Sequence, residues 1–160
     1  MTSQKIIVRK YKPEDSQDLA DIYYNTIHLI NIQHYTDEQI KVWAPDTSLE
    51  SSEWAKKFEK TKPLVAMIGE IIVGFVEFEP NGHIDCFYCH HNYIGCGVGS
   101  ILMKSVYEIA IQKEIKRIFA EVSITARPFF EKQGFTVIEE QTVVLHGVKL
   151  INYKMEKYLA

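Results

Sequence analysis

The stretch from residue 63 to residue 91, PLVAMIGEIIVGFVEFEPNGHIDCFYCHH, constrains the fold more than any other part of the chain. Its apolar and β-branched runs are interrupted by Gly69-Glu70 and by Pro80-Asn81-Gly82, which are residues typical of tight turns. This spacing predicts three successive strands joined by hairpins. Because hairpin-linked strands pair antiparallel, we expect an antiparallel sheet in the middle of the chain.

Helices and further strands are predicted on both sides of this segment. Upstream we expect a strand at 5–11, a helix starting near Pro13, a helix opened by the capping box Thr36 to Gln39, and a short helix through Trp54 and Phe58. Downstream we expect a helix at 98–113, a strand at 117–122, a short helix starting near Pro128, and strands at about 135–145 and 147–156. This order predicts a mixed α+β fold with a central, mostly antiparallel sheet of about seven strands flanked by helices.

Length and composition favour one domain over residues 1–160. A chain of 160 residues with 46% apolar content can bury a core without help from metals or disulfides. Its net charge of -3 offers no broad positive field to nucleic acid or to an anionic membrane, so we expect neither as a partner. The segment MTSQKIIVRKYKPED lacks the apolar core of a signal peptide, and no apolar run approaches the roughly 18 residues of a membrane span. We therefore expect a cytoplasmic protein.

All three cysteines and three of the six histidines lie between residues 83 and 96, which suggests a metal site. In a strand, however, Cys86 and Cys89 point to opposite faces and lie about 10 Å apart along the chain. The two aromatic residues between them favour a strand over the tight turn of a zinc knuckle. We therefore predict reduced thiols and no metal site, and we keep a metal-binding regulatory domain as the least favoured hypothesis.

Glycines at positions 95, 97 and 99 lie between a predicted strand and a predicted helix. Glycine lets the backbone approach a ligand, and a helix amino terminus offers unpaired amides and a partial positive charge. The pattern indicates a pyrophosphate site or, alternatively, a plain turn. A P-loop would need Lys and then Ser or Thr after the last glycine, and a dinucleotide fingerprint would follow the first strand of a parallel unit. Neither condition is met.

This arrangement resembles the GNAT superfamily of N-acetyltransferases over nearly the whole chain, from residue 5 to residue 156. The family signature, Gln or Arg-x-x-Gly-x-Gly or Ala, falls on Ile94 to Gly99, and a segment similar to FYEKxGF falls on Phe129 to Phe135. The resemblance implies transfer of an acetyl group from acetyl-CoA to a primary amine by direct attack in a ternary complex. The cofactor-binding residues that it implies are Phe87, Tyr88 and Cys89 for the pantetheine arm, and Gly95, Cys96, Gly97, Val98, Gly99 and Ser100 for the pyrophosphate.

The sequence departs from this family pattern at two positions. Ile94 replaces a polar residue, which removes a side-chain contact but keeps the backbone cradle. Phe130 stands where many members have a tyrosine thought to protonate the departing thiolate. A thiol with a pKa of about 8.5 can leave without that help. The absence of a tyrosine at position 130 also leaves a second hypothesis open, a catalytically weak CoA-binding or partner-binding module.

An alkylamine with a pKa of about 10.4 must lose a proton before it attacks. His83 and Asp85 lie two residues apart on one predicted strand, hence on one face, and either is a candidate base or the two form a hydrogen-bonded surface pair. Glu77 is a third candidate, and we favour a solvated position for it. Tyr153 is a candidate acid, although core packing is the stronger interpretation. A backbone amide near Cys89 is expected to stabilise the oxyanion.

The acceptor is the least constrained part of the prediction. The family places the acceptor wall between the first strand and the second hairpin. Here that region contains the candidates Tyr23, Tyr24, His34, Tyr35 and Trp43, which alternatively belong to the core. We expect a small-molecule or peptide amine as substrate, and a monomer or homodimer.

Overall fold

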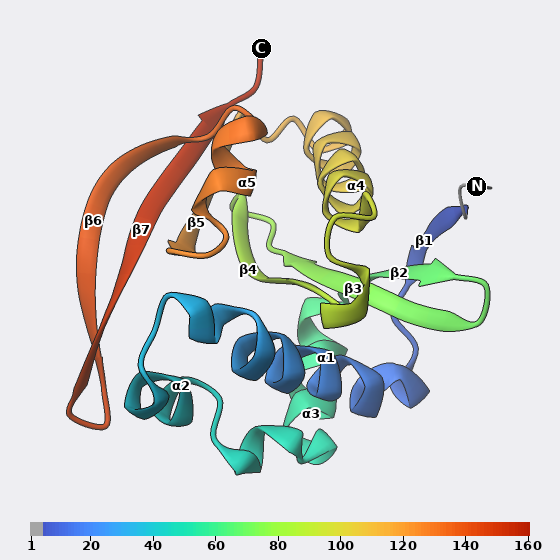
Figure 1. Ribbon diagram of the computed structural model, residues 1–160. Coiled ribbons are helices and arrows are strands. Elements are labelled where there is room, and N and C mark those ends of the chain that lie inside the picture. The colour runs from blue at the N-terminus through green and yellow to red at the C-terminus, as the bar shows by residue number, and fades with distance from the viewer. Residues whose placement is uncertain (1–4) are drawn as a thin grey trace.

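The computed structural model describes residues 5–160. The first four residues of the stretch MTSQKIIVRKYKPED, which we expect not to be a signal peptide, lie outside the described residues. Seven strands form one sheet in the order β1-β2-β3-β4-β5-β7-β6 (Figure 1). The strands are β1 (Ile6–Lys10), β2 (Leu64–Ile68), β3 (Ile71–Phe78), β4 (His83–Cys89), β5 (Arg117–Ser123), β6 (Thr136–Leu145) and β7 (Val148–Tyr158). The predicted fold class, an α+β fold with a mostly antiparallel sheet, is confirmed.

The helices lie where the start signals predict them, within a few residues. They are α1 (Ser16–Leu29), α2 (Asp37–Trp43), α3 (Ser51–Thr61), α4 (Val98–Gln112) and α5 (Arg127–Lys132). The predicted capping box at the start of α2 is present, because Thr36 Oγ1 accepts from the Gln39 amide and Gln39 Oε1 accepts from the Thr36 amide. None of the helices formed by residues 5–160 combines the length and the apolarity that crossing a membrane requires.

Among residues 5–160 a hydrophobic core lies on each face of the sheet, and a third cluster that includes Ile27, Ile40 and Leu150 joins α1, α2 and β7. Helix α4 covers one face with Leu102, Met103 and Val106, and α1 and α3 cover the other with residues such as Leu19 and Phe58 (Figure 1). All five side chains are fully buried. Strand β4 contributes to both cores, so its side chains can reach ligands or helices on either side of the sheet.

The amino-terminal end of α4 packs closely against β3 at Gly74. A Cβ atom at this position would lie 2.8 Å from Val98 Cγ1 and 3.0 Å from the carbonyl oxygen of Tyr88. Such distances are too short for packed atoms, so only glycine lets the helix approach the sheet here. This contact fixes the start of α4 beside the carboxyl end of β4.

The parallel pair β4–β5 is the exception in the sheet, and it is short. Its paired residues are His83 with Phe119 and Ile84 with Ala120. Beyond Ile84 the two strands diverge, while β4 continues along β3 as far as Cys89. The carboxyl-terminal half of β4 therefore has a strand neighbour on one side and an open fork on the other.

A bulge in β4 changes which side chains face α3. Val76 pairs with Phe87 and Phe78 pairs with Ile84, so Glu77 of β3 lies opposite two residues, Asp85 and Cys86. Both of these residues point toward Glu77 and α3. Our expectation of a solvated Glu77 is wrong, because its side chain has 0% exposure under α3.

Candidate active site

The fork between β4 and β5 opens into a cavity with a volume of about 790 Å³. Residues 84–89 of β4 and residues 120–123 of β5 line two of its sides. The loop before α4 and the first turn of that helix line a third side, and α1, α3 and the β6–β7 hairpin complete the wall. One continuous space thus joins the glycine-rich loop to the aromatic side chains of the helical layer.

The glycine-rich loop has a backbone suited to bind an anion. Gly95 and Gly97 have φ angles of +81° and +90°, a conformation that side chains other than glycine rarely adopt. The first helical hydrogen bond of α4 runs from Ile101 to the Gly97 carbonyl, so the amides from Val98 to Ser100 have no carbonyl partner inside the helix. These N–H groups line the cavity at the positive end of the helix dipole.

Gly99 serves a different purpose, since it allows close packing. A Cβ atom here would lie 3.0 Å from Cε1 of Phe129 and 3.7 Å from Sγ of Cys89. Phe129 in turn packs against Phe87 and Phe130, with ring centroids 5.5 Å and 5.6 Å apart. The apolar side chains of α5 therefore border the cavity immediately beside the first turn of α4.

The backbone of β4 offers unpaired groups to the fork. The amide of His90 donates to the Val73 carbonyl. Because opposite residues in an antiparallel ladder alternate between hydrogen-bonded and non-hydrogen-bonded pairs, the neighbouring pair, Cys89 with Gly74, has no mutual hydrogen bonds. By the same alternation, the N–H groups of Cys89 and Phe87 point away from β3, into the fork. The carbonyl of Cys89 accepts from Thr26 Oγ1 at 2.8 Å, which ties α1 to the end of the strand.

The predicted cofactor-binding residues therefore come together around one space. Eight of the nine line the cavity, namely Phe87, Tyr88, Cys89, Gly95, Gly97, Val98, Gly99 and Ser100. Cys96 belongs to the same loop, but it is exposed and does not line the cavity. Ile94 lines the rim and is 49% exposed.

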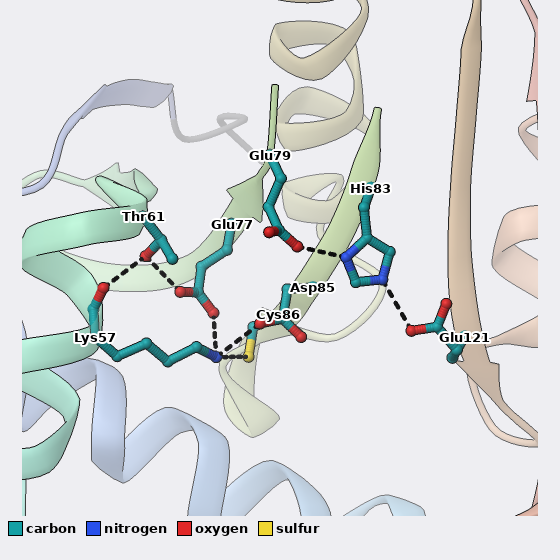
Figure 2. A network of polar contacts seen from close by, with 8 residues as sticks. All are labelled: Lys57, Thr61, Glu77, Glu79, His83, Asp85, Cys86 and Glu121. Atoms are coloured by element: carbon teal, nitrogen blue, oxygen red, sulfur yellow. Dashed lines mark hydrogen bonds and ion pairs between the residues drawn. The ribbon is translucent and has the colours of Figure 1, made fainter. Parts of the chain in front are cut away.

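Lys57 of α3 joins three acidic or sulfur-containing groups beside the cavity (Figure 2). Its Nζ lies 2.8 Å from Oε1 of Glu77, 2.9 Å from Oδ2 of Asp85 and 3.5 Å from Sγ of Cys86. Burial lowers the pKa of Lys57, but the surrounding groups outweigh this and raise it above its ordinary value. Lys57 is therefore a permanent cation that holds Asp85 at the cavity wall.

His83 bridges two carboxylates rather than pairing with Asp85 (Figure 2). Its Nδ1 binds Glu79, and its Nε2 lies 2.8 Å from Oε1 of Glu121 on β5. Burial lowers the pKa of His83, but the hydrogen bonds to the two carboxylates outweigh it and raise the pKa overall. Asp85 and Glu121 line the cavity, whereas His83 stands behind Glu121 and does not.

The structure places three of the five residues predicted for the acceptor wall in the lining of the cavity. Tyr23, Tyr35 and Trp43 line the cavity. Tyr24 instead donates to Asp46, and His34 Nδ1 forms a hydrogen bond with the Thr125 hydroxyl. Neither Tyr24 nor His34 lines the cavity. Tyr153, the candidate acid, also lies outside it and stacks with the guanidinium of Arg127.

The three thiols do not form one ligand set. Cys86 belongs to the core under α3 and Cys89 packs against the core under α4, so the prediction that they face opposite ways is confirmed. Burial raises the pKa of Cys89 to about 12 and that of Cys86 well above its ordinary value. Within residues 5–160, the group with ligand atoms close enough for a metal is Glu77, Asp85 and Cys86, and the Lys57 ammonium contacts all three.

Comparison with known proteins decides the family. The model of the acetyltransferase (GNAT) domain matches residues 31–157. The chain belongs to the GNAT acetyltransferase family. It is 33% identical over 150 residues to the uncharacterized N-acetyltransferase YafP of Escherichia coli strain K12, with 94% of each chain covered.

Solved structures agree with this GNAT assignment. A GCN5-related N-acetyltransferase from Rhodopseudomonas palustris superposes with a TM-score of 0.91 at 28% identity, and the match covers 99% of each chain. The PaiA N-acetyltransferase of Thermoplasma acidophilum, solved in complex with coenzyme A, has a TM-score of 0.76 at 18% identity. That match covers 97% of this chain and 99% of the other.

Several polar residues of the GNAT site were not found from the sequence. Lys57, Glu121, Asn31 and Asn152 come from four different elements and line the cavity. Lys57 resembles any other lysine of an amphipathic helix, because the sequence does not show which acids its end meets. In the sequence, Asn152 looks like any polar residue of an alternating, exposed hairpin. Only the structure shows that its Oδ1 is buried without a partner among residues 5–160.

Proposed function

We propose that this GNAT protein is an acetyl-CoA-dependent N-acetyltransferase that holds the thioester in the β4–β5 fork. The observation that carries the proposal is the fork itself. The N–H groups of Phe87 and Cys89, which point away from β3, lie beside the same cavity as the free amides that begin α4. We also propose that residues 1–160 act as a single domain.

The residues of the cavity fit acetyl-CoA by their chemistry. The amides from Val98 to Ser100 suit a pyrophosphate, because they have no carbonyl partner inside the helix and the conformations of Gly95 and Gly97 let a ligand approach the backbone. The N–H group of Phe87 suits an amide carbonyl of a pantetheine arm, which would add to the sheet as a short strand beside Phe87, Tyr88 and Cys89. When bound, the thioester supplies an activated acetyl group for attack by an amine.

Direct attack requires a group that takes the proton of the amine. Asp85 lines the cavity with a side chain that is 40% exposed, and Lys57 fixes one of its oxygens. His83 reaches the cavity only through Glu121. We therefore propose Asp85 as the base at the amine and His83 as a residue that can accept a proton from Glu121 behind the cavity wall. The amide of Cys89, which points into the fork, is suited to stabilise the oxyanion.

The departing thiolate has no tyrosine beside it at position 130. Phe130 is 4% exposed and packs against Phe87 and Phe135. Catalysis then relies on the modest basicity of the thiolate itself. This feature favours the second function, a CoA-binding module with weak turnover.

An acetyl-CoA consumption assay over a panel of primary amines, combined with calorimetry of acetyl-CoA binding, separates these functions. An enzyme binds acetyl-CoA and consumes it in an amine-dependent manner, with Asp85→Asn reducing kcat by on the order of 100-fold. Binding without turnover on any amine supports the module, and absence of heat with millimolar acetyl-CoA overturns both. Full activity in both Asp85→Asn and His83→Ala contradicts the assignment of the base.

The remaining expectations are proposals with direct tests. A small-molecule or peptide amine as acceptor is tested by the same panel. A cytoplasmic location is tested by cell fractionation, and size-exclusion chromatography distinguishes a monomer from a homodimer.

A further inference from the structure

The charges beside the acceptor end of the cavity do not cancel. Glu77 is fully buried and forms an ion pair with Lys57, so these two groups together carry no net charge. Asp85 is the second carboxylate on the same ammonium, and it adds one negative charge at the cavity wall. Lys57 therefore holds Asp85 in place, but Lys57, Glu77 and Asp85 together keep one net negative charge.

Two more polar groups lie on the opposite side of the fork, and one of them is a carboxylate. Glu121 of β5 is 43% exposed and lines the cavity. Asn152 of β7 also lines it, with a side-chain amide that can both donate and accept hydrogen bonds. Acceptors on both sides of the space suit a ligand that brings several N–H donors, as a primary ammonium group does.

Aromatic rings form the wall next to Asp85. Tyr23 packs against Trp54 with ring centroids 4.7 Å apart and against Tyr88 with centroids 5.1 Å apart. Tyr35 and Trp43 form a second pair at 5.2 Å. All five rings line the cavity. Such a surface favours an apolar or aromatic body and attracts a cation through the ring faces.

A carboxylate on the acceptor would find little compensation here. The basic side chains of the described residues that line the cavity are Lys57 and Lys132. The ammonium of Lys57 already contacts Glu77, Asp85 and Cys86, which matches its three N–H donors. Lys132 ends α5, the helix whose Phe129 borders the glycine-rich loop, and so belongs to the proposed cofactor side.

We propose that the acceptor is a primary amine with a single positive charge on an apolar, preferably aromatic, body, and that Asp85 holds its ammonium group. This inference rests on the proposed acetyltransferase function and names the substrate class of the same site. It disfavours free amino acids, whose carboxylate would lie near Asp85 and Glu121, and small hydrophilic amines, which leave the aromatic wall uncovered.

Four matched probes test the inference with the wild-type protein: 2-phenylethylamine, L-phenylalanine, L-phenylalaninamide and ethylamine. Phenylalanine and its amide share a body and differ in the negative charge. We expect kcat/KM for phenylethylamine to exceed that for ethylamine and for phenylalanine by on the order of 10-fold or more. We expect phenylalaninamide to recover most of the loss seen with phenylalanine.

The variant Asp85→Asn assigns the charge effect to its residue. Loss of a base lowers kcat for every amine, whereas loss of the anionic anchor lowers the ratio of kcat/KM for phenylalaninamide over phenylalanine. We expect this ratio to fall by on the order of 10-fold in Asp85→Asn. Glu53→Gln is the matched control, because Glu53 lies on α3 with a side chain that is 78% exposed, and the ratio should not change.

The outcomes separate this inference from the proposed function. Turnover that prefers phenylalanine or ethylamine overturns the acceptor class and leaves the acetyltransferase intact. The acceptor class is also overturned if the protein binds acetyl-CoA but neither turns over phenylethylamine nor binds it saturably. This binding is measured by calorimetry in the presence of CoA. Failure to bind acetyl-CoA at all contradicts the proposed function first.

Discussion

The ammonium of Lys57 lies 2.8 Å from the carboxylate of Glu77, a side chain with no solvent exposure at all. This ion pair joins α3 to β3, two elements that β2 separates in the sequence (Figure 2). The same ammonium reaches Asp85 at the cavity wall. The pair therefore links the packing of α3 on the sheet to the geometry of the proposed acceptor site.

Lys57→Met should destabilise the protein by about 2 kcal/mol or more, because it leaves the buried Glu77 carboxylate without its cation, although the Thr61 hydroxyl still donates to it. The measurement is chemical denaturation monitored by circular dichroism. Lys56→Met is the matched control. Among residues 5–160 its ammonium pairs with the exposed Glu53, and its side chain is 74% exposed, so we expect a change within about 0.5 kcal/mol.

Adding Glu77→Leu to Lys57→Met should recover part of that stability, because the uncompensated charge is then removed. A double variant that is less stable than Lys57→Met would contradict this account of the pair.

Gly97→Ala should weaken acetyl-CoA binding, because a φ of +90° is strained for alanine and relaxation moves the amides that begin α4. We expect the Kd for CoA, measured by calorimetry, to rise by on the order of 10-fold. Gly147→Ala is the control for strain alone, since Gly147 has a φ of +78° in the β6–β7 turn with no atom within 4 Å. Equal effects of both variants on the Kd would argue against a cofactor role for the loop.

His83 should stabilise the fold more at low pH than at high pH. Its pKa in the folded protein is raised, so its stabilising contribution is fully present below the unfolded pKa of about 6.5 and is lost as pH rises through the folded pKa. The Tm difference between wild type and His83→Gln should therefore be largest near pH 5.5 and smaller at pH 8.5. A difference that grows with pH would contradict the assigned bridge to Glu79 and Glu121.

Cysteine labelling should modify one thiol per chain rapidly. Cys96 is exposed, whereas Cys86 is buried and burial raises the pKa of Cys89 to about 12, which suppresses its thiolate. We expect mass spectrometry after brief iodoacetamide treatment at pH 8 to find the label on Cys96. CoA should slow this reaction if the glycine-rich loop binds it. Rapid labelling of Cys89 in the folded protein would contradict the packing beneath α4.

Much of the fold could be predicted from local signals. The turns at Gly69 and at Pro80 to Gly82 separate the strands of the central hairpins, and the capping box at Thr36 places the start of α2 correctly. Alternation along β4 also predicts that Cys86 and Cys89 face different cores. These features depend on residues close together in the chain, whose conformational preferences act before any distant contact forms.

Burial of charged groups was decided by the tertiary structure alone. Glu77 has the sequence context of a half-exposed strand, yet α3 brings Lys57 over it and the bulge in β4 turns Asp85 and Cys86 toward the same point. His83 and Asp85 share a strand face as expected, but each binds partners from other elements. The sequence by itself determined the strands, the turns and the glycine-rich helix start, because these follow from local backbone preferences. Only the tertiary structure decided which charges meet and how the cavity is lined, because those contacts join residues far apart in the chain.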